Sequence, residues 1–178
     1  MLKIGILGGS FNPPHQGHLN ISNLAIKKLQ LNQLWWIPTK YNTLKDINIY
    51  QSYETRVNLC IKITNNNSKI IVKPYPEIHS YKLINYLQKK YPQIQFIWVM
   101  GADSLFNLHH WNQFRKILEM IDIAVFSRDN LLNKIHKSKS FIIAKKRFYN
   151  QKIKIIRIRE TNISSTMIRK SIKNNLIS

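Results

Sequence analysis

The sequence is poor in features that would place it among secreted, metal-cluster or membrane proteins. Its 178 residues include a single cysteine, Cys60, so the chain can form neither an intrachain disulfide nor a cysteine-based metal cluster. No apolar run approaches the roughly 18 residues that a membrane-spanning helix requires. The short apolar stretch at the N-terminus leads into a Gly/Pro-rich turn, and it predicts a first strand rather than a signal peptide. We therefore expect a cytoplasmic protein.

Acidic residues are also scarce. The chain has 8 Asp and Glu against 28 Lys and Arg, which gives a net charge of +20. A field of this sign attracts phosphate groups, whether they belong to nucleotides or to nucleic acids. Isoleucine, lysine and asparagine are all abundant and all have A/T-rich codons, so the charge also fits a bias in genome composition. Charge alone does not assign a function.

The order of apolar and helical segments predicts one α/β domain. The expected strands are 2–8, 33–38, 69–72, 95–100, 121–126 and 152–158. The expected helices are 18–29, 52–63, 81–90, 111–120 and 165–173, and the basic segment 128–150 is left unassigned. Strands that alternate with helices and are apolar on both faces predict a doubly wound, mostly parallel sheet. Trp35, Trp36 and Trp98 lie within strands, and we expect them in the core.

Four unusual segments each follow a predicted strand: 8–18, 38–45, 101–103 and 161–169. In a doubly wound sheet the carboxyl ends of the strands meet at one edge, and ligands bind there. We therefore expect these segments to converge on a single binding site.

The first of these segments reads GGSFNPPHQGH over residues 8–18. Glycines after a strand allow a ligand close to the backbone, and free amides at the start of the following helix can receive a phosphate. His15 and His18 are three residues apart and share a helix face, where both can donate to phosphate oxygens that gain charge during a displacement. A metal-binding pair and a simple helix cap are the alternatives, although no cysteine or acidic residue lies nearby to complete a metal site.

The second segment reads TNISSTMIR over residues 161–169. Ser164, Ser165 and Thr166 precede an amphipathic stretch, although capping a helix requires only one hydroxyl. The surplus hydroxyls and amides predict a second anion site, to which Arg169 can contribute a bidentate guanidinium. Two such helix starts suit a triphosphate bound between them.

Together, HQGH at 15–18 and ISST at 163–166 with Arg169 resemble the HxGH nucleotidyltransferase superfamily. The resemblance implies a Rossmann-like fold and magnesium-dependent adenylyl transfer, in which an acceptor phosphate attacks the α-phosphate of ATP and pyrophosphate leaves. It implies catalytic roles for His15, His18 and Arg169. The ATP-binding residues that it implies are Gly8, Gly9, Ser10, Phe11, His15, His18, Ser164, Ser165, Thr166 and Arg169.

The segments between these motifs resemble the nicotinate-nucleotide adenylyltransferases. The resemblance rests on LWWIP at 34–38, NTLK at 42–45, MGADSL at 100–105 and Trp111. It implies nicotinate mononucleotide as acceptor, deamido-NAD as product and Mg²⁺ as the ion that accompanies ATP. The acceptor-binding residues that it implies are Lys45, Ser80, Tyr81, Gly101, Asp103 and Trp111.

Chemistry supports two of these acceptor-side roles. The indole of Trp111 can stack on a flat pyridine ring. Asp103 can hold a ribose hydroxyl or help to position the magnesium ion, and the sequence leaves both roles open. Lys82 stands where many relatives have threonine, which is a departure from the family pattern at the acceptor pocket.

Two other functions compete with this interpretation. Pantetheine-phosphate adenylyltransferases share the chemistry, but they usually have threonine at the position of His15 and lack the tryptophan-rich elements. A non-catalytic nucleic-acid-binding domain explains the charge but not two phosphate motifs at one edge, and the chain carries no known nucleic-acid motif. We expect ATP and nicotinate mononucleotide as partners, no specific nucleic acid and no membrane. A monomer and a homo-oligomer fit the sequence equally well.

Overall fold

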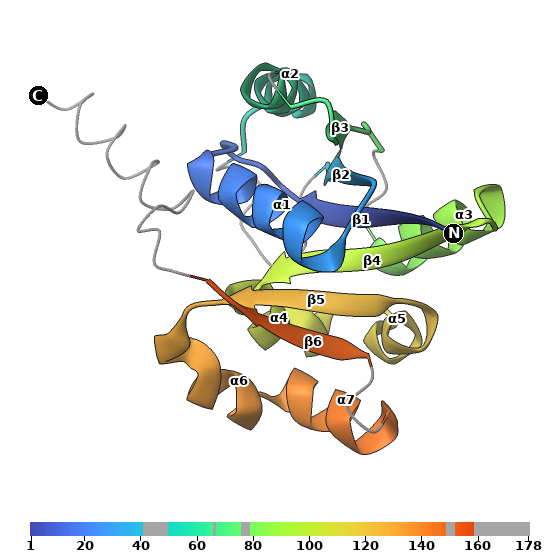
Figure 1. The fold of residues 1–178 in the computed structure, drawn as a ribbon, viewed down its shortest axis with the longest axis vertical. Coiled ribbons are helices and arrows are strands. Elements are labelled where there is room, and N and C mark those ends of the chain that lie inside the picture. Colours follow the sequence, from blue (N-terminus) through green and yellow to red (C-terminus); the bar gives the residue numbers. More distant parts are fainter. Residues whose placement is uncertain (41–49, 66, 76–78, 149–151, 159–178) are drawn as a thin grey trace, which may run out of the picture.

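Figure 1 shows the computed structural model, which describes residues 1–40, 50–65, 67–75, 79–148 and 152–158. The strands are β1 (Leu2–Gly9), β2 (Gln33–Pro38), β3 (Ile70–Val72), β4 (Ile94–Gly101), β5 (Asp122–Ser127) and β6 (Ile153–Arg157). The α-helices are α1 (Gln16–Leu29), α2 (Tyr53–Thr64), α3 (Ser80–Lys90), α4 (Ala102–Asn107), α5 (Phe114–Met120), α6 (Leu132–Lys137) and α7 (Lys139–Phe148). Two 3₁₀ turns complete these elements, η2 (Leu108–His110) and η3 (Asp129–Leu131).

The six strands form one sheet in the order β3-β2-β1-β4-β5-β6, and every described pair is parallel. The chain moves outward from β1 to β3, then crosses back to add β4 on the other side of β1. The strand order therefore reverses between β1 and β4, which is where doubly wound sheets bind their ligands. The Rossmann-like α/β fold expected from the sequence is confirmed.

Helices cover both faces of the sheet, so each face has its own apolar core (Figure 1). Ala25 of α1 and Cys60 of α2 pack with Trp36 on one face. The remaining helices, α3 to α7, cover the other face, where Trp98 is buried. The relative exposures of Trp35, Trp36 and Trp98 are 6%, 0% and 2%, so the expectation that these three belong to the core is confirmed.

The predicted helix over 111–120 is wrong at its start. The chain forms α4 and the turn η2 before this point, and Trp111 then adopts extended backbone angles. Gln113 has a φ of 55°, in the left-handed region, and α5 begins only at Phe114. The unassigned segment 128–150 contains α6 and α7, whose buried side chains include Ile135 and Ala144. The helix predicted over 165–173 lies outside the described residues.

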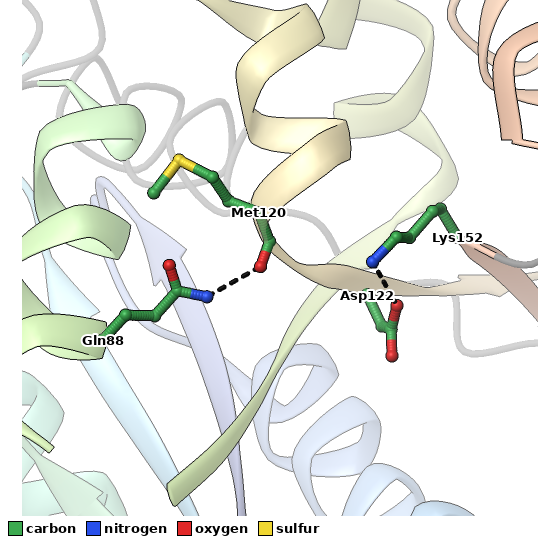
Figure 2. Close-up of polar contacts among 4 residues, drawn as sticks. All are labelled: Gln88, Met120, Asp122 and Lys152. Atoms are coloured by element: carbon green, nitrogen blue, oxygen red, sulfur yellow. Dashed lines mark hydrogen bonds and ion pairs between the residues drawn. The ribbon is translucent and has the colours of Figure 1, made fainter. Parts of the chain in front are cut away.

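Polar contacts hold the edge of the sheet where the strands begin (Figure 2). Gln88 of α3 donates from Nε2 to the carbonyl oxygen of Met120, at the end of α5, over 2.7 Å. Lys152 Nζ lies 3.3 Å from Oδ1 of Asp122, the first residue of β5. Such partly exposed ion pairs contribute at most about 1 kcal/mol. These contacts lie at the opposite edge of the sheet from the carboxyl ends of the strands.

Within the described ranges, no helix has the length and apolar character needed to cross a membrane.

Candidate active site

The carboxyl ends of β1, β2 and β4 lie level with one another. Gly9, the last residue of β1, is paired in register with Pro38, the last residue of β2. Ile6 pairs with Trp98, and β1 and β4 each end three residues later, at Gly9 and Gly101. Three of the four segments expected at the site therefore begin at one edge of the sheet. The fourth, 161–169, lies outside the described residues.

His15 and His18 cap the start of α1 by exchanging hydrogen bonds with the backbone. Nδ1 of His15 accepts from the amide of Gly17 over 3.1 Å, and Nδ1 of His18 accepts from the amide of His15 over 3.2 Å. The two ring centroids are 3.8 Å apart. An imidazole that accepts through Nδ1 carries its proton on Nε2 when it is neutral. The cap therefore selects the same tautomer for both histidines, with Nε2–H as the donor.

Burial lowers the pKa of His15 below its ordinary value of 6.5, because removing the ring from water penalises its charged form. His15 is therefore neutral at pH 7 and can donate from Nε2. The expected free amides are partly engaged, since those of His15 and Gly17 serve the cap and that of His18 donates to the carbonyl of His15. At these three positions a phosphate would meet imidazole N–H groups rather than free backbone amides.

Buried side chains pack against the ring of His18 and bond to its backbone. Phe11 stacks on Trp36 with ring centroids 4.8 Å apart, and its ring is also 4.8 Å from that of His18. Nε1 of Trp36 donates to Oγ of Ser22 over 2.8 Å, and this hydroxyl donates to the carbonyl of His18 over 2.7 Å. Phe11 is 2% exposed because its ring packs against Trp36 and His18, and its contact with ATP stays a prediction.

Sequence reasoning missed Ser22 and the positioning role of Trp36. A serine four residues after His18, in a helix that packs on a strand tryptophan, is the signal that was available. A hydroxyl at this spacing can bond to the carbonyl one turn earlier. The same hydroxyl then satisfies the indole N–H, which would otherwise be a buried donor without an acceptor.

The glycines at this edge differ in what surrounds them. A Cβ on Gly8 would lie 2.8 Å from the buried ring of Trp98, so packing alone requires glycine there. A Cβ on Gly9 would approach nothing closer than 3.6 Å, the distance to the ring of Phe11. A Cβ on Gly101 would meet no atom within 4 Å. A methyl group at Gly9 would therefore fit in ordinary contact with the Phe11 ring, whereas Gly101 has open space beside it.

Of the residues expected on the acceptor side, Ser80, Tyr81, Asp103 and Trp111 lie on the sheet face covered by α3, α4 and α5, and Gly101 ends β4. Asp103 is exposed in the first turn of α4, where a helix N-terminus favours negative charge. Trp111 is half-buried, and its ring meets that of Trp98 at 76° with centroids 5.9 Å apart. Ser80 and Tyr81 are the first two residues of α3, and Nζ of Lys116 lies 5.6 Å from the centre of the Tyr81 ring.

The remaining predicted site residues lie outside the described residues. These are Lys45 on the acceptor side and Ser164, Ser165, Thr166 and Arg169 of the second phosphate motif. Their roles stay predictions.

Comparison with known proteins places this geometry in a family. Residues 6–171 match the cytidylyltransferase-like family. A probable nicotinate-nucleotide adenylyltransferase from Pelagibacter ubique is 37% identical over 172 residues, which cover 94% of this chain and 92% of the relative. One from Ruegeria sp. is 37% identical over 130 residues, covering 71% of this chain and 68% of the relative. This chain belongs to the nicotinate-nucleotide adenylyltransferase family.

A solved structure of an adenylyltransferase has the same fold. The nicotinic acid mononucleotide adenylyltransferase of Plasmodium falciparum superposes with a TM-score of 0.76, covering 96% of this chain and 83% of that one. Sequence identity between the two is 21%, so the likeness establishes the fold. In this nicotinate-nucleotide adenylyltransferase, β1 and β4 end level with each other and the paired histidines lie at the start of α1.

Proposed function

We propose that this chain transfers the adenylyl group of ATP to nicotinate mononucleotide, which yields deamido-NAD and pyrophosphate. The observation that carries the proposal is the pair His15 and His18, fixed as Nε2–H donors at the carboxyl edge of the sheet. The chain that bears this pair is related along 94% of its length to a probable nicotinate-nucleotide adenylyltransferase. The Plasmodium enzyme of the same fold was solved in complex with NaAD.

The reaction requires positioning and charge stabilisation rather than a covalent intermediate. A phosphate oxygen of the acceptor attacks the α-phosphorus of ATP, a new P–O bond forms, and the bond to the departing pyrophosphate breaks. Negative charge grows on the phosphate oxygens during this displacement. Imidazoles that already present Nε2–H can stabilise that charge without reorganising, and the N-terminus of α1 adds a favourable dipole.

Magnesium is part of this proposal as the partner of ATP. Within the described ranges, no three His, Cys, Asp or Glu side chains gather in a metal-binding cluster. Mg²⁺ does not need one, because in nucleotide sites it usually keeps several waters and binds substrate phosphates with one or two carboxylates. The exposed carboxylate of Asp103, in the first turn of α4 just after β4, fits that requirement. When bound, the ion would neutralise charge on the phosphate oxygens.

A cytoplasmic location completes the proposal. Support comes from the single cysteine of the chain, which suits a reducing compartment, and from the use of ATP as a substrate.

The test is pyrophosphate release from ATP and Mg²⁺ with three acceptors in parallel: nicotinate mononucleotide, nicotinamide mononucleotide and 4′-phosphopantetheine. We expect efficient turnover with the first and a much lower kcat/KM with the other two. Turnover with 4′-phosphopantetheine alone would keep the chemistry and overturn the acceptor. Folded protein that releases pyrophosphate with none of them would overturn the proposal.

A further inference from the structure

Arg56, in the first turns of α2, is a buried arginine that joins three segments of the carboxyl edge. Its side chain is 1% exposed. Nε donates to the carbonyl of Gln51 over 3.1 Å, and one terminal nitrogen donates to the carbonyls of Thr39, over 2.9 Å, and Ser10. The other terminal nitrogen donates to the carbonyl of Lys40. Within the described residues, every hydrogen bond of this guanidinium therefore ends on a main-chain oxygen.

The segments that Arg56 joins are those that form the proposed site. Ser10 belongs to the loop that connects β1 to the capping histidines. Thr39 and Lys40 follow β2 and lead into 41–49, which contains the predicted acceptor residue Lys45. The amide of Thr39 also donates to the carbonyl of Gly9 over 2.9 Å. One side chain thus ties the loop that leads to the capping histidines to Thr39 and Lys40, the two residues that directly follow β2.

Three further contacts keep this arrangement fixed. The guanidinium carbon lies 5.4 Å from the ring centre of Tyr50 and 5.6 Å from that of Tyr53, distances at which aromatic rings attract a cation. Oδ1 of Asn12, itself buried, accepts from the amide of Gln51 over 3.1 Å. The loop after β1 is therefore bonded twice to the start of α2, once through Arg56 and once through Asn12.

Burying a cation is costly unless its hydrogen bonds are satisfied. Burial also lowers the pKa of Arg56, because removal from water penalises the charged guanidinium. A buried apolar residue would stabilise α2 without that cost. A planar group with five donors is needed, however, to bond carbonyls from several segments at once, and a lysine ammonium cannot reproduce that geometry.

We infer that Arg56 is a positioning residue for adenylyl transfer, which holds the loop after β1 and the loop after β2 at the separation that the two substrates require. The inference rests on the function proposed above. Displacing one of these loops by a fraction of an ångström would misalign the acceptor phosphate with the α-phosphorus. Misplacement of about 1 Å costs as much as a hundredfold in rate.

The experiment compares Arg56→Lys and Arg56→Ala with two controls. Arg115→Lys makes the same chemical change at an exposed position of α5. Gln88→Ala removes a hydrogen bond to a carbonyl at the far edge of the sheet. For each folded variant, kcat and the KM of both substrates are measured well below its Tm. We expect Arg56→Lys to lower kcat by about tenfold to a hundredfold, and both controls to keep the wild-type value. Millimolar guanidinium should restore part of the activity of Arg56→Ala, whereas methylammonium should not.

A second readout does not depend on turnover. Hydrogen exchange at the amide of Thr39 reports the bond to Gly9 that Arg56 supports. We expect faster exchange at Thr39 in Arg56→Lys and no change in either control. Wild-type exchange and wild-type kinetics in a folded Arg56→Lys would overturn the inference, as would activity that falls only in proportion to the unfolded fraction. If the wild-type chain turns over none of the acceptors, the proposed function fails, and the exchange at Thr39 still decides whether Arg56 holds the two loops.

Discussion

The rings of His15 and His18 lie 3.8 Å apart across the first turn of α1, and each uses Nδ1 to accept a backbone N–H. Serine, threonine and acidic side chains usually fill such caps. Using imidazoles instead fixes the orientation and tautomer of both rings before any substrate arrives. The hydrogen bonds that begin the helix therefore also prepare the donors on which the proposed chemistry depends.

Replacing His18 with alanine should lower kcat by roughly a hundredfold or more while ATP binding changes little, because the imidazole acts mainly on the charge of the transition state. His18→Asn separates this role from capping, since an asparagine Oδ1 can accept the amide of His15 but offers no group at the position of Nε2. We expect His18→Asn to keep a near wild-type Tm and to lose as much kcat as His18→Ala. Steady-state kinetics and thermal unfolding provide the check. An effect confined to the KM of ATP would contradict a role in the transition state.

The lowered pKa of His15 predicts how acid affects the enzyme. Protonation at Nδ1 would place a proton against the amide of Gly17 and break the cap. Because the pKa is lowered only in the folded state, the unfolded chain binds more protons just below pH 6.5, and stability falls as the pH falls through that range. Well above pH 6.5, by about one pH unit, both states are neutral and this dependence disappears.

Activity should follow the same protonation. We expect the acid limb of kcat/KM to lie below pH 6.5, and the ring resonances of His15 to titrate in the same range by NMR. His15→Asn, which keeps an acceptor for Gly17, provides the control: its lower activity should no longer depend on this ionisation. A His15 that titrates at or above 6.5 would contradict the assignment of a neutral donor.

Much of the fold could be predicted from the sequence because its strands are strongly apolar and end at clear punctuation. The apolar segments that form β1, β2 and β4 predicted both the sheet and the edge at which Gly9 and Gly101 lie level. The helix boundary near Trp111 could not be predicted, because the left-handed turn at Gln113 uses neither glycine nor asparagine. The helices α6 and α7 were not predicted, because their many lysines obscure the helical spacing of their apolar residues.

The site divides in a similar way. The histidines could be recognised because their spacing is a pattern in the sequence. Arg56 could not, because its hydrogen bonds end on main-chain carbonyls, which leave no signature in the side chains of its partners. Ser22 was missed for a related reason, since one of its two bonds is to the carbonyl of His18. The roles of Lys45 and of the residues in 164–169 stay predictions.

Alanine substitutions at the three glycines of the carboxyl edge should distinguish a glycine required for packing from a glycine that lies against a ligand. Gly8→Ala should destabilise the fold by about 1–3 kcal/mol, because its Cβ would press on the buried ring of Trp98. Gly9→Ala and Gly101→Ala have room for a methyl group, so both should unfold like the wild type. If a bound nucleotide lies against the open side of Gly101, Gly101→Ala should raise the KM of ATP or of the acceptor, whereas a methyl group at Gly9 would contact the ring of Phe11. Chemical denaturation and kinetics on the three variants test both statements. A stable Gly8→Ala would contradict the packing role.

Trp111 provides the last test, because its half-buried ring can serve either as packing or as a stacking surface for the pyridine of the acceptor. If it stacks on the acceptor, Trp111→Ala should raise the KM of nicotinate mononucleotide by about five- to 150-fold, since one aromatic stack contributes about 1–3 kcal/mol in comparable base-binding sites. The KM of ATP should change little. Trp111→Phe keeps an aromatic face against Trp98 and should recover most of the acceptor affinity. An equal rise in the KM of both substrates, accompanied by a lower Tm, would instead identify Trp111 as a packing residue whose removal loosens the Trp98 side of the site.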